Sequence, residues 1–208
     1  TYQKSIDLKI PTINKFFSFK LSEKLIRDYK KADLIIANNV YAHVPDIKDF
    51  TKGIKNLLNI KGTITIEFPH LLNLVKFNQF DTVYHEHYSY LSINFLEKIF
   101  DEFDLKIYDI KKIKTHGGSL RVYGCHKSFK KKRISSNVKY ILNEEVRYGL
   151  LNEKKYLTLA NKAYKIKKEF RNFLYKVKKE KKTVVAYGAA AKGNTFSNYC
   201  NIDSSLIK

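Results

Sequence analysis

Methionine and tryptophan are absent from this 208-residue sequence, and glycine, proline and cysteine number only 8, 3 and 2. A complete chain of this length normally begins with Met and contains several more, so we expect a fragment of a longer protein. The first glycine is Gly53, which excludes a glycine-rich cofactor loop from the residues before it. Cys125 and Cys200 have neither zinc-site nor CxxC spacing and demand no disulfide.

Long hydrophobic runs are also missing. No apolar stretch approaches the about eighteen residues that a membrane-spanning helix needs, and no secretory signal pattern opens the sequence. Without a disulfide requirement either, the sequence is typical of a reducing compartment. We therefore expect a cytoplasmic protein with no membrane partner.

The formal net charge of +20 suggests a nucleic-acid partner at first sight. Arginine, however, is scarce, since Lys outnumbers Arg by 35 to 5. Phosphate and base recognition depend heavily on the planar guanidinium of Arg. Much of the charge lies between Lys127 and Lys182, where it suits a solvated helical face. We expect no specific nucleic-acid partner.

The hydrophobic pattern predicts an α/β fold. The continuous apolar run at 32–37 predicts a strand buried on both faces, and residues 63–68 predict the next strand. The pattern between them predicts a helix from Pro45 to Gly62. A helix capped by Ser92 should precede two strands, at 105–110 and 120–125. A helix followed by two such strands suits a Rossmann-like sheet that closes with an antiparallel hairpin.

The remaining sequence differs in kind. Apolar residues recur at steps of three and four from Val138 to Val177, which predicts two amphipathic helices broken near Gly149. Residues 183–187 then predict a new buried strand that leads into a further βα unit. We expect three parts: residues 1–126 as the sheet domain, 127–182 as a helical connector, and 183–208 as the beginning of a C-terminal substrate-binding domain.

The richest chemistry lies in Phe80–Tyr90, which contains two histidines, a glutamate and three tyrosines. Histidine changes charge near neutral pH, and a neighbouring carboxylate can orient it or raise its basicity. A phenol can donate a hydrogen bond to a developing oxyanion. An aromatic-rich surface loop explains the stretch equally well from its composition alone. His85 and His87 could also ligate a metal, although no further ligand follows at motif spacing.

Two glycine-containing turns are weaker candidates. Gly117 and Gly118 expose backbone N–H groups between the two predicted hairpin strands. The stretch 188–195 combines small residues, a predicted helix start and Lys192, which together favour a bound anion. Its order is wrong for a Walker A loop, because Lys192 precedes the second glycine. A tight strand-to-helix turn is the structural alternative.

Five motifs in this order resemble the sugar C-methyltransferases, and they span nearly the whole sequence. They are Asn39–Asp46 (NVYAHVPD), Glu67–His70 (EFPH), Phe80–His87 (FDTVYHEH), His116–Arg121 (HGGSLR) and Tyr187–Thr195 (YGAAAKGNT). Members of that family use S-adenosyl-L-methionine (SAM) to methylate a carbon of a nucleotide-linked keto-deoxysugar. A zinc-binding N-terminal segment, a Rossmann-like SAM domain and a C-terminal substrate-binding domain are implied by the resemblance.

The resemblance also implies residue roles. His87 would be the base that removes the C3 proton of a 4-keto sugar, and the resulting enolate would attack the SAM methyl group. Glu86, Tyr84 and His43 would line the reacting sugar, with Tyr84 or His43 stabilising the enolate oxygen. Asn38 and Asn39 would lie near SAM. The two glycine-containing turns supply the expected substrate-binding residues: His116, Ser119, Arg121, Tyr187, Lys192 and Asn194.

The sequence departs from the family at its beginning. The glycine-rich SAM loop and the zinc cysteines of the family have no counterpart in it. We therefore expect structural zinc only in a missing N-terminal part, and we expect the isolated chain to be inactive. The alternative from another class is a non-catalytic remnant or a module that binds sugar nucleotides; a metal-dependent hydrolase is a more distant one.

Overall fold

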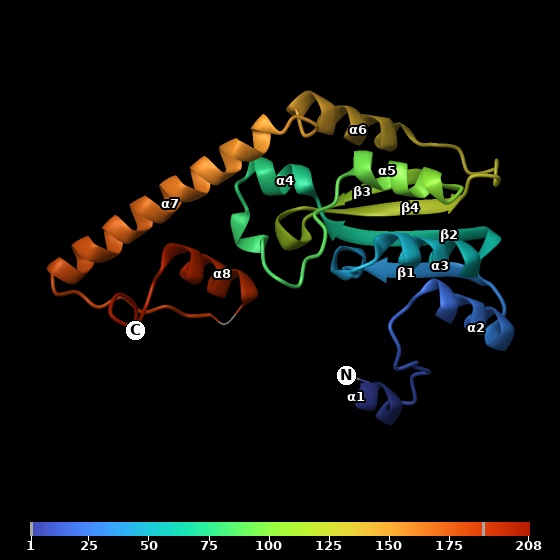
Figure 1. The fold of residues 1–208 in the computed structure, drawn as a ribbon, viewed down its shortest axis with the longest axis horizontal. Coiled ribbons are helices and arrows are strands. Elements are labelled where there is room, and N and C mark those ends of the chain that lie inside the picture. The colour runs from blue at the N-terminus through green and yellow to red at the C-terminus, as the bar shows by residue number, and fades with distance from the viewer. Residues whose placement is uncertain (1, 189) are drawn as a thin grey trace.

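The computed structural model describes residues 2–188 and 190–208, and these form a mixed α/β fold with a four-stranded sheet (Figure 1). The strand order is β1-β2-β4-β3, where β1 is Ala32–Asn38, β2 Leu58–Pro69, β3 Leu105–Ile113 and β4 Ser119–His126. β1 and β2 run parallel, whereas β4 is antiparallel to both β2 and β3. The predicted α/β class and the closing hairpin are confirmed.

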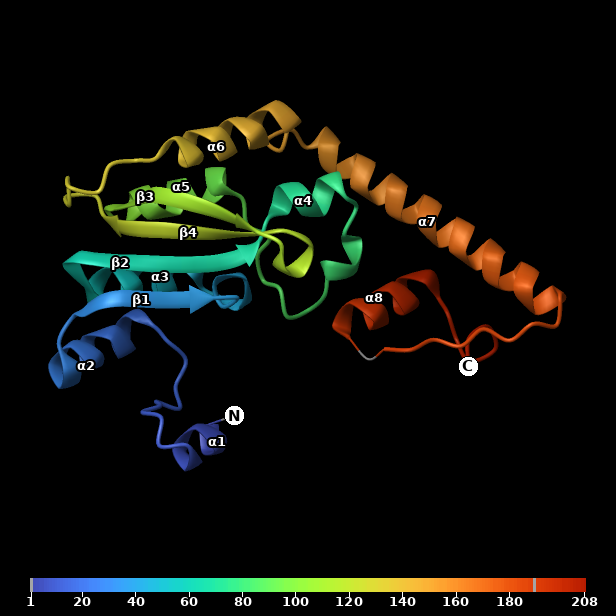
Figure 2. The same ribbon diagram turned by 180° about the vertical axis from the view of Figure 1, so that it is seen from behind.

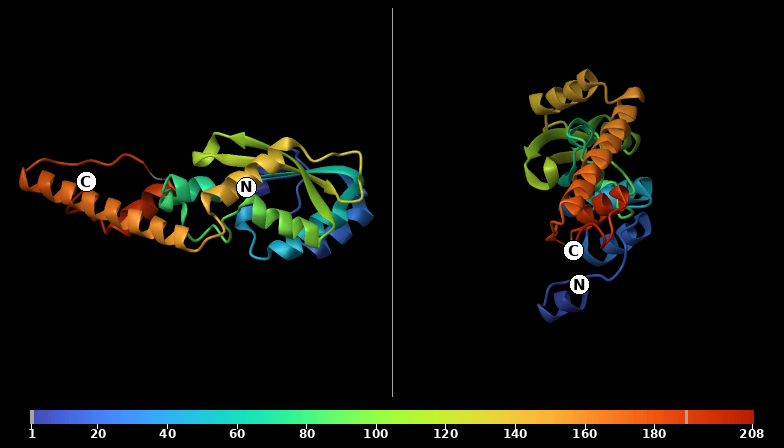
Figure 3. Two further views of the ribbon diagram at one scale, coloured as in Figure 1. Left: turned by 90° about the horizontal axis from the view of Figure 1, so that it is seen from above. Right: turned by 90° about the vertical axis from the view of Figure 1, so that its left-hand side faces the viewer.

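One face of the sheet is covered by helices α3 (Ile47–Leu57) and α5 (Ile93–Glu102) (Figure 3). Alternate side chains of β2 point into this layer and are fully buried there, namely Ile64, Ile66 and Phe68. On β1, Leu34 and Ile36 are 54% and 62% exposed. The prediction that β1 is buried on both faces is therefore wrong for the described residues, because α3 and α5 cover a single face of the sheet.

The helix between β1 and β2 begins at a strong cap. The carboxylate of Asp46 accepts hydrogen bonds from the backbone N–H groups of Lys48 and Asp49, at 3.1 and 2.9 Å. The helix ends at Leu57, not near Gly62 as predicted. Leu58 is fully buried and pairs with Ala32, so β2 starts at once. Gly62 lies within this strand, where a Cβ atom would come within 3.0 Å of the Ala32 carbonyl oxygen.

The chain between β2 and α5 contains residues Phe80–Tyr90, which are called the histidine-rich stretch below. It contains α4 (Leu71–Lys76) and the short 3₁₀ helix η2 (Phe80–Thr82), followed by an irregular run to Ser92. The Ser92 hydroxyl accepts the backbone N–H of Phe95 at 3.1 Å, which confirms it as the cap of α5. β3 and β4 are then joined by the 3₁₀ turn η3 (Thr115–Gly117).

Two helices follow the sheet and confirm the predicted break near Gly149. α6 (Ser136–Tyr148) packs against β3 and α5, and its Val138 and Ile141 belong to the main core. α7 (Lys154–Lys179) projects away from the sheet (Figures 1 and 2). α8 (Ala191–Cys200) lies beside α7 and packs on η2, with Phe80 and Tyr199 ring centroids 5.0 Å apart. α1 (Tyr2–Asp7) and α2 (Phe19–Tyr29) precede β1.

The predicted strand at residues 183–187 is wrong, because the described residues there form no strand. The stretch is extended and largely exposed, and Val185 keeps 73% of its surface. Its long-range backbone hydrogen bonds go to Lys208 of the same chain, whose N–H donates to the Val184 carbonyl at 2.9 Å. A β-strand forms only where a partner strand runs beside the whole segment, and Lys208 alone does not supply one. The three-part division and a second Rossmann-like domain stay predictions, and Ala189 of the last motif lies outside the described residues.

No described helix combines the length and the apolar character that crossing a membrane requires.

Gly118 and Gly193 form a matched pair for testing the turn between β3 and β4. Gly118 has φ +108°, and a Cβ atom would meet Asn73 Nδ2, which itself donates to the Gly118 carbonyl. We expect Gly118→Ala to lower the free energy of unfolding by about 1–3 kcal/mol. An added Cβ at Gly193, in α8, meets nothing within 4 Å, so Gly193→Ala should be neutral or stabilising by about 0.5–1 kcal/mol. Chemical denaturation measures both, and equal effects would contradict this account.

Candidate active site

The site begins where β1 ends. Asn38 is the last strand residue, and Asn39 turns the chain with a left-handed φ of 53° while its N–H donates to the Glu67 carbonyl at 2.8 Å. The following 3₁₀ helix, η1 (Tyr41–His43), brings His43 to this edge of the sheet. In open α/β sheets, ligands bind beyond the carboxyl ends of the strands. Asn38 and Asn39 are exposed there.

Tyr41 anchors η1 in the core. Its side chain is completely buried, and its hydroxyl is hydrogen-bonded to Thr51 of α3. Burial raises the pKa of the Tyr41 phenol far above its ordinary value, so the group remains neutral. Its ring also packs edge-on against Phe50, with centroids 5.8 Å apart. The adjacent His43 is therefore held on a fixed support.

The histidine-rich stretch is tied directly to η1. The backbone N–H groups of Tyr88 and Ser89 both donate to the Ala42 carbonyl, at 3.0 and 3.1 Å. His43 Nδ1 also lies 2.7 Å from the Glu86 carbonyl oxygen. These bonds bring together two segments that are more than forty residues apart in sequence. His43 and the stretch from Tyr84 to Tyr90 thus meet at one rim.

The three other side chains predicted to be catalytic lie around His87. Its ring centroid lies 4.7 Å from that of His43 and 4.5 Å from that of Tyr84. Tyr90 adds a third ring, edge-on at 5.8 Å. Glu86 is exposed, and its charge acts on both Tyr84 and His87. The structure therefore gathers all four residues predicted to be catalytic.

The tautomer of His87 follows from one contact. Its Nδ1 atom lies 2.8 Å from the Thr82 carbonyl oxygen, which can only accept a hydrogen bond. Nδ1 must therefore carry a proton, and in the neutral ring Nε2 has a free lone pair. The neighbouring His43 is in the same situation, because its Nδ1 faces the Glu86 carbonyl. Both neutral rings can accept a proton at Nε2.

The surroundings keep His87 neutral over a wide pH range. Burial lowers its pKa below the ordinary value, although the bond to Thr82 opposes this shift. The positive charge of Lys192 and the neighbouring His43 lower the pKa further, while Glu86 raises it. A base with a lowered pKa is ready to accept a proton at neutral pH.

The two nearby phenols are proton donors. Partial burial, and then the Glu86 carboxylate, raise the pKa of Tyr84. Burial also raises the pKa of Tyr90. Both side chains therefore stay protonated at neutral pH, and each can donate one hydrogen bond to an acceptor in the site.

A small pocket lies next to His87. The lining comes from η1, the end of β2, α4 and the histidine-rich stretch: Ala42, Pro69, Leu71, Leu74, Thr82, His87, Ser89 and Tyr90.

Two of the three predicted substrate-binding residues of the β3–β4 turn, Ser119 and Arg121, have partners within the protein. Arg121 forms an ion pair with Glu67 across the sheet, with Nη2 2.8 Å from Oε2. Ser119 is buried and donates to the Thr115 carbonyl at 3.1 Å. His116 is exposed with a left-handed φ of 52°. Their contacts with a substrate stay a prediction.

The residues predicted near the C-terminal motif are placed differently from one another. Lys192 lies at the start of α8, close enough for its charge to act on His87. Asn194 is exposed on the same helix, and Tyr187 is fully exposed in the extended stretch before it. Of these three, Lys192 is the residue whose charge lowers the pKa of His87.

The metal alternative gains no support from residues 2–188 and 190–208. Among them, no three or more His, Cys, Asp or Glu side chains are grouped so that they could hold a metal ion. His87 directs Nδ1 to the Thr82 carbonyl, and Glu86 is exposed.

Two contributors were missed from the sequence. Thr82 orients His87 through its backbone carbonyl, which every residue type possesses, so no sequence signal exists for it. Tyr90 lies beside His87, and its position within the same aromatic cluster was the available signal.

Comparisons with known proteins relate both halves of the chain to methyltransferases. Residues 8–110 match a family model described as a methyltransferase domain, and residues 114–208 match one described as the C-methyltransferase C-terminal domain. The chain is 30% identical over 202 residues to the C-methyltransferase NovU of Streptomyces niveus. That alignment covers 97% of this chain and 48% of NovU.

The chain belongs to the C-methyltransferase family. It spans about half the length of the curated relative that it matches. Solved structures with a partial likeness to this chain include M1.HpyAVI (14% identity, TM-score 0.35, covering 54% of this chain and 52% of that one). Another is the magnesium protoporphyrin IX methyltransferase ChlM of Synechocystis PCC 6803 with bound SAH (15% identity, TM-score 0.36, covering 46% and 45%).

We expect Lys192→Gln to raise the pKa of His87, because it removes a nearby positive charge that disfavours the imidazolium. Glu86→Gln should lower that pKa for the opposite reason. An NMR titration of the His87 ring in the unliganded protein measures both. Lys127→Gln is the control, since Lys127 pairs with Asp101 beyond the far end of β4. An unchanged pKa of His87 in Lys192→Gln would show that Lys192 does not act on this site.

Proposed function

We propose that this chain is part of a SAM-dependent C-methyltransferase that acts on a nucleotide-linked 4-keto-deoxysugar, with His87 as the base. The observation that carries the proposal is the contact between His87 Nδ1 and the Thr82 carbonyl, which leaves Nε2 free to accept a proton beside the pocket. The family membership supports the methyl transfer, and the sugar substrate and the role of His87 are our inference.

The first step is proton removal from C3 of the sugar. A neighbouring 4-keto group acidifies this proton, because the electron pair of the broken C–H bond moves into an enolate. Nε2 of His87 takes the proton and becomes positively charged. The Nδ1 proton keeps its bond to Thr82 throughout, so the ring does not have to turn.

The enolate oxygen needs a hydrogen-bond donor, and the structure favours Tyr84 over His43. The Tyr84 phenol stays protonated because its pKa is raised, and its ring lies beside that of His87. A neutral His43 uses its proton at Nδ1 toward Glu86, so its Nε2 has none to give. Donors that are already in place stabilise developing negative charge most effectively.

The exposed end of β1 suits the cofactor. Asn38 and Asn39 present amide groups at the rim that also carries His43, and amides hydrogen-bond to hydroxyl and amino groups alike. When bound, SAM supplies the electrophilic methyl group. Two side chains alone do not make a complete cofactor site, so we assign them a place beside SAM rather than the whole of its binding.

Substrate recognition would fall to Lys192. Its ammonium acts on His87, and a cation at the beginning of α8 suits a diphosphate. Arg121 is a weaker candidate, because its guanidinium is already bonded to Glu67 through Nε and Nη2.

Exchange at C3 tests the proposal without requiring methyl transfer. The natural full-length protein is incubated with a nucleotide-linked 4-keto-deoxysugar in deuterated water, and deuterium at C3 is followed by NMR. We expect His87→Ala to slow enzyme-dependent exchange by about 10²–10⁴-fold, the usual contribution of a general base. His85→Ala is the matched control, since His85 is exposed two residues away. Exchange that survives His87→Ala would remove His87 from this role.

The same experiment distinguishes this enzyme from the alternative, a module that binds sugar nucleotides without catalysis. Such a module would bind the nucleotide sugar and show no exchange above the buffer rate in the unmodified protein.

A further inference from the structure

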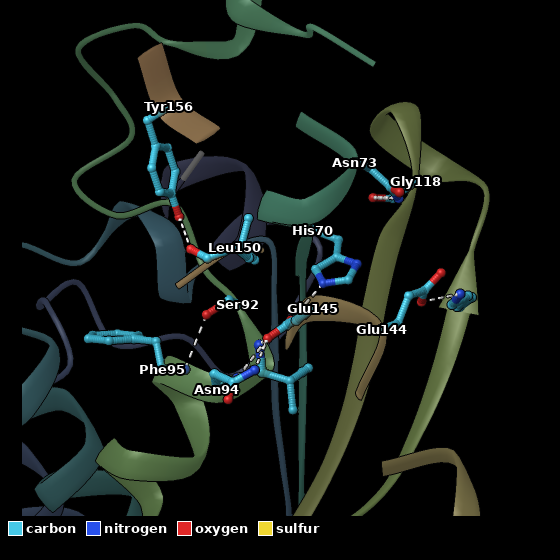
Figure 4. Close-up of polar contacts among 12 residues, drawn as sticks. His70, Asn73, Ser92, Asn94, Phe95, Gly118, Glu144, Glu145, Leu150 and Tyr156 are labelled. Carbon is cyan, nitrogen blue, oxygen red and sulfur yellow. Dashed lines mark hydrogen bonds and ion pairs between the residues drawn. The ribbon is translucent and has the colours of Figure 1, made fainter. Parts of the chain in front are cut away.

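A buried carboxylate lies outside the pocket and has no place in the chemistry above. Glu145 of α6 points toward the junctions of β2 with α4 and of Ser92 with α5 (Figure 4). Its Oε1 atom lies 2.7 Å from His70 Nε2, and the two side chains are 0% and 1% exposed. Groups of this kind are almost never fully buried unless they are paired.

Backbone and side-chain donors complete the environment of Glu145. Oε1 accepts the N–H of Ile93 at 2.7 Å, and Oε2 accepts both the backbone N–H and the side-chain amide of Asn94, at 2.9 and 2.7 Å. These N–H groups open α5, where the helix dipole favours an anion. α6 therefore supplies a cap to a helix more than fifty residues earlier in the sequence.

Glu145 is ionised. Burial alone would raise its pKa, but the hydrogen bonds from His70, Asn94 and Ile93 outweigh burial and bring the pKa below the ordinary value. An ionised carboxylate only accepts hydrogen bonds, so His70 Nε2 carries the proton in this pair.

The partners of Glu145 are the two ends of one segment. His70 stands immediately before α4, and Ile93 is the first residue of α5. Residues 71–92 between them contain Tyr84, Glu86 and His87. Next to Glu145, the backbone N–H of Leu71 donates to the Leu91 carbonyl at 3.0 Å, so the segment is closed at its base.

The closed base is also fixed to the hairpin. The backbone N–H of His70 donates to the Gly118 carbonyl at 3.1 Å, and the side chain of Asn73 donates to the same oxygen. One carboxylate of α6 thus joins three elements: the end of β2, the start of α5 and, through His70, the β3–β4 turn.

We propose that Glu145 is a positioning residue that holds both ends of the segment 70–94 and thereby fixes His87 against His43 and Tyr84. The inferred importance of Glu145 for catalysis rests on the proposed function of His87. Its effect on the position of segment 70–94 does not rest on that function. Between its ends the segment is attached to η1 through Tyr88 and Ser89, which donate to Ala42. Releasing the ends should therefore loosen these two bonds first.

Native-state hydrogen exchange of the natural full-length protein, without substrate, tests this positioning. In Glu145→Gln we expect the Tyr88 and Ser89 amides to exchange about tenfold faster or more, while amides of β2 remain as in the unmodified protein. Glu144→Gln is the matched control, because Glu144 precedes Glu145 and pairs with Lys112 at the protein surface. Equal acceleration over the whole sheet, or no change at Tyr88 and Ser89, would overturn the proposal.

A milder variant covers the case in which Glu145→Gln does not fold. Asn94→Ala removes one donor to Oε2 and leaves the carboxylate and His70 in place. We expect it to accelerate the same two amides by a smaller factor, and no acceleration would count against the proposal.

Kinetics give the second measurement. Glu145 is not among the residues that line the pocket, so its loss should lower kcat with little change in KM, by up to about 10²-fold if the base moves by an ångström. A change in KM alone would contradict a positioning role. If the unmodified protein shows no activity, the proposed function fails, and the hydrogen-exchange result still decides whether Glu145 holds the segment.

Discussion

The position of the segment around His87 depends on the hydrogen bonds of one buried, ionised carboxylate, that of Glu145. Removing a charge from water costs several kcal/mol, and only close, complementary partners offset that cost. Glu145 has four hydrogen-bond donors, all between 2.7 and 2.9 Å. Because such bonds to a charged group are worth about 1.5–3 kcal/mol each, displacing any one element would leave the charge under-solvated. The end of β2, the start of α5 and helix α6 are therefore fixed relative to one another.

Fixed ends allow an irregular segment to carry chemistry. The stretch around His87 has little regular secondary structure, yet its hydrogen bonds to Ala42 and the ring contacts with His43 and Tyr84 determine its position. Loops on a rigid scaffold commonly hold functional residues in this way. Here the scaffold includes α6, so this helix and the sheet together hold the segment in place. Lys192 brings α8 into the same electrostatic environment.

Sequence patterns predicted the strands at 32–37 and 63–68, the hairpin and the two connector helices, because period and capping are local signals. They also identified His43 and the histidine-rich stretch, since both follow strands that end at one edge. They failed at residues 183–187, where an apolar run found no partner strand, and at Gly62, a close approach inside β2. The Thr82 carbonyl and the burial of Glu145 depend on tertiary contacts that leave no local signal.

The central claim is that His87 has a free lone pair at Nε2 because its Nδ1 proton is held by the Thr82 carbonyl. Nitrogen-15 NMR of the His87 ring at a pH above its pKa measures this directly, since protonated and unprotonated ring nitrogens have well-separated chemical shifts. The account predicts the Nδ1–H tautomer. Finding the proton on Nε2 would contradict it, because the lone pair would then lie on Nδ1, against the Thr82 carbonyl, where it could not remove a proton from the sugar.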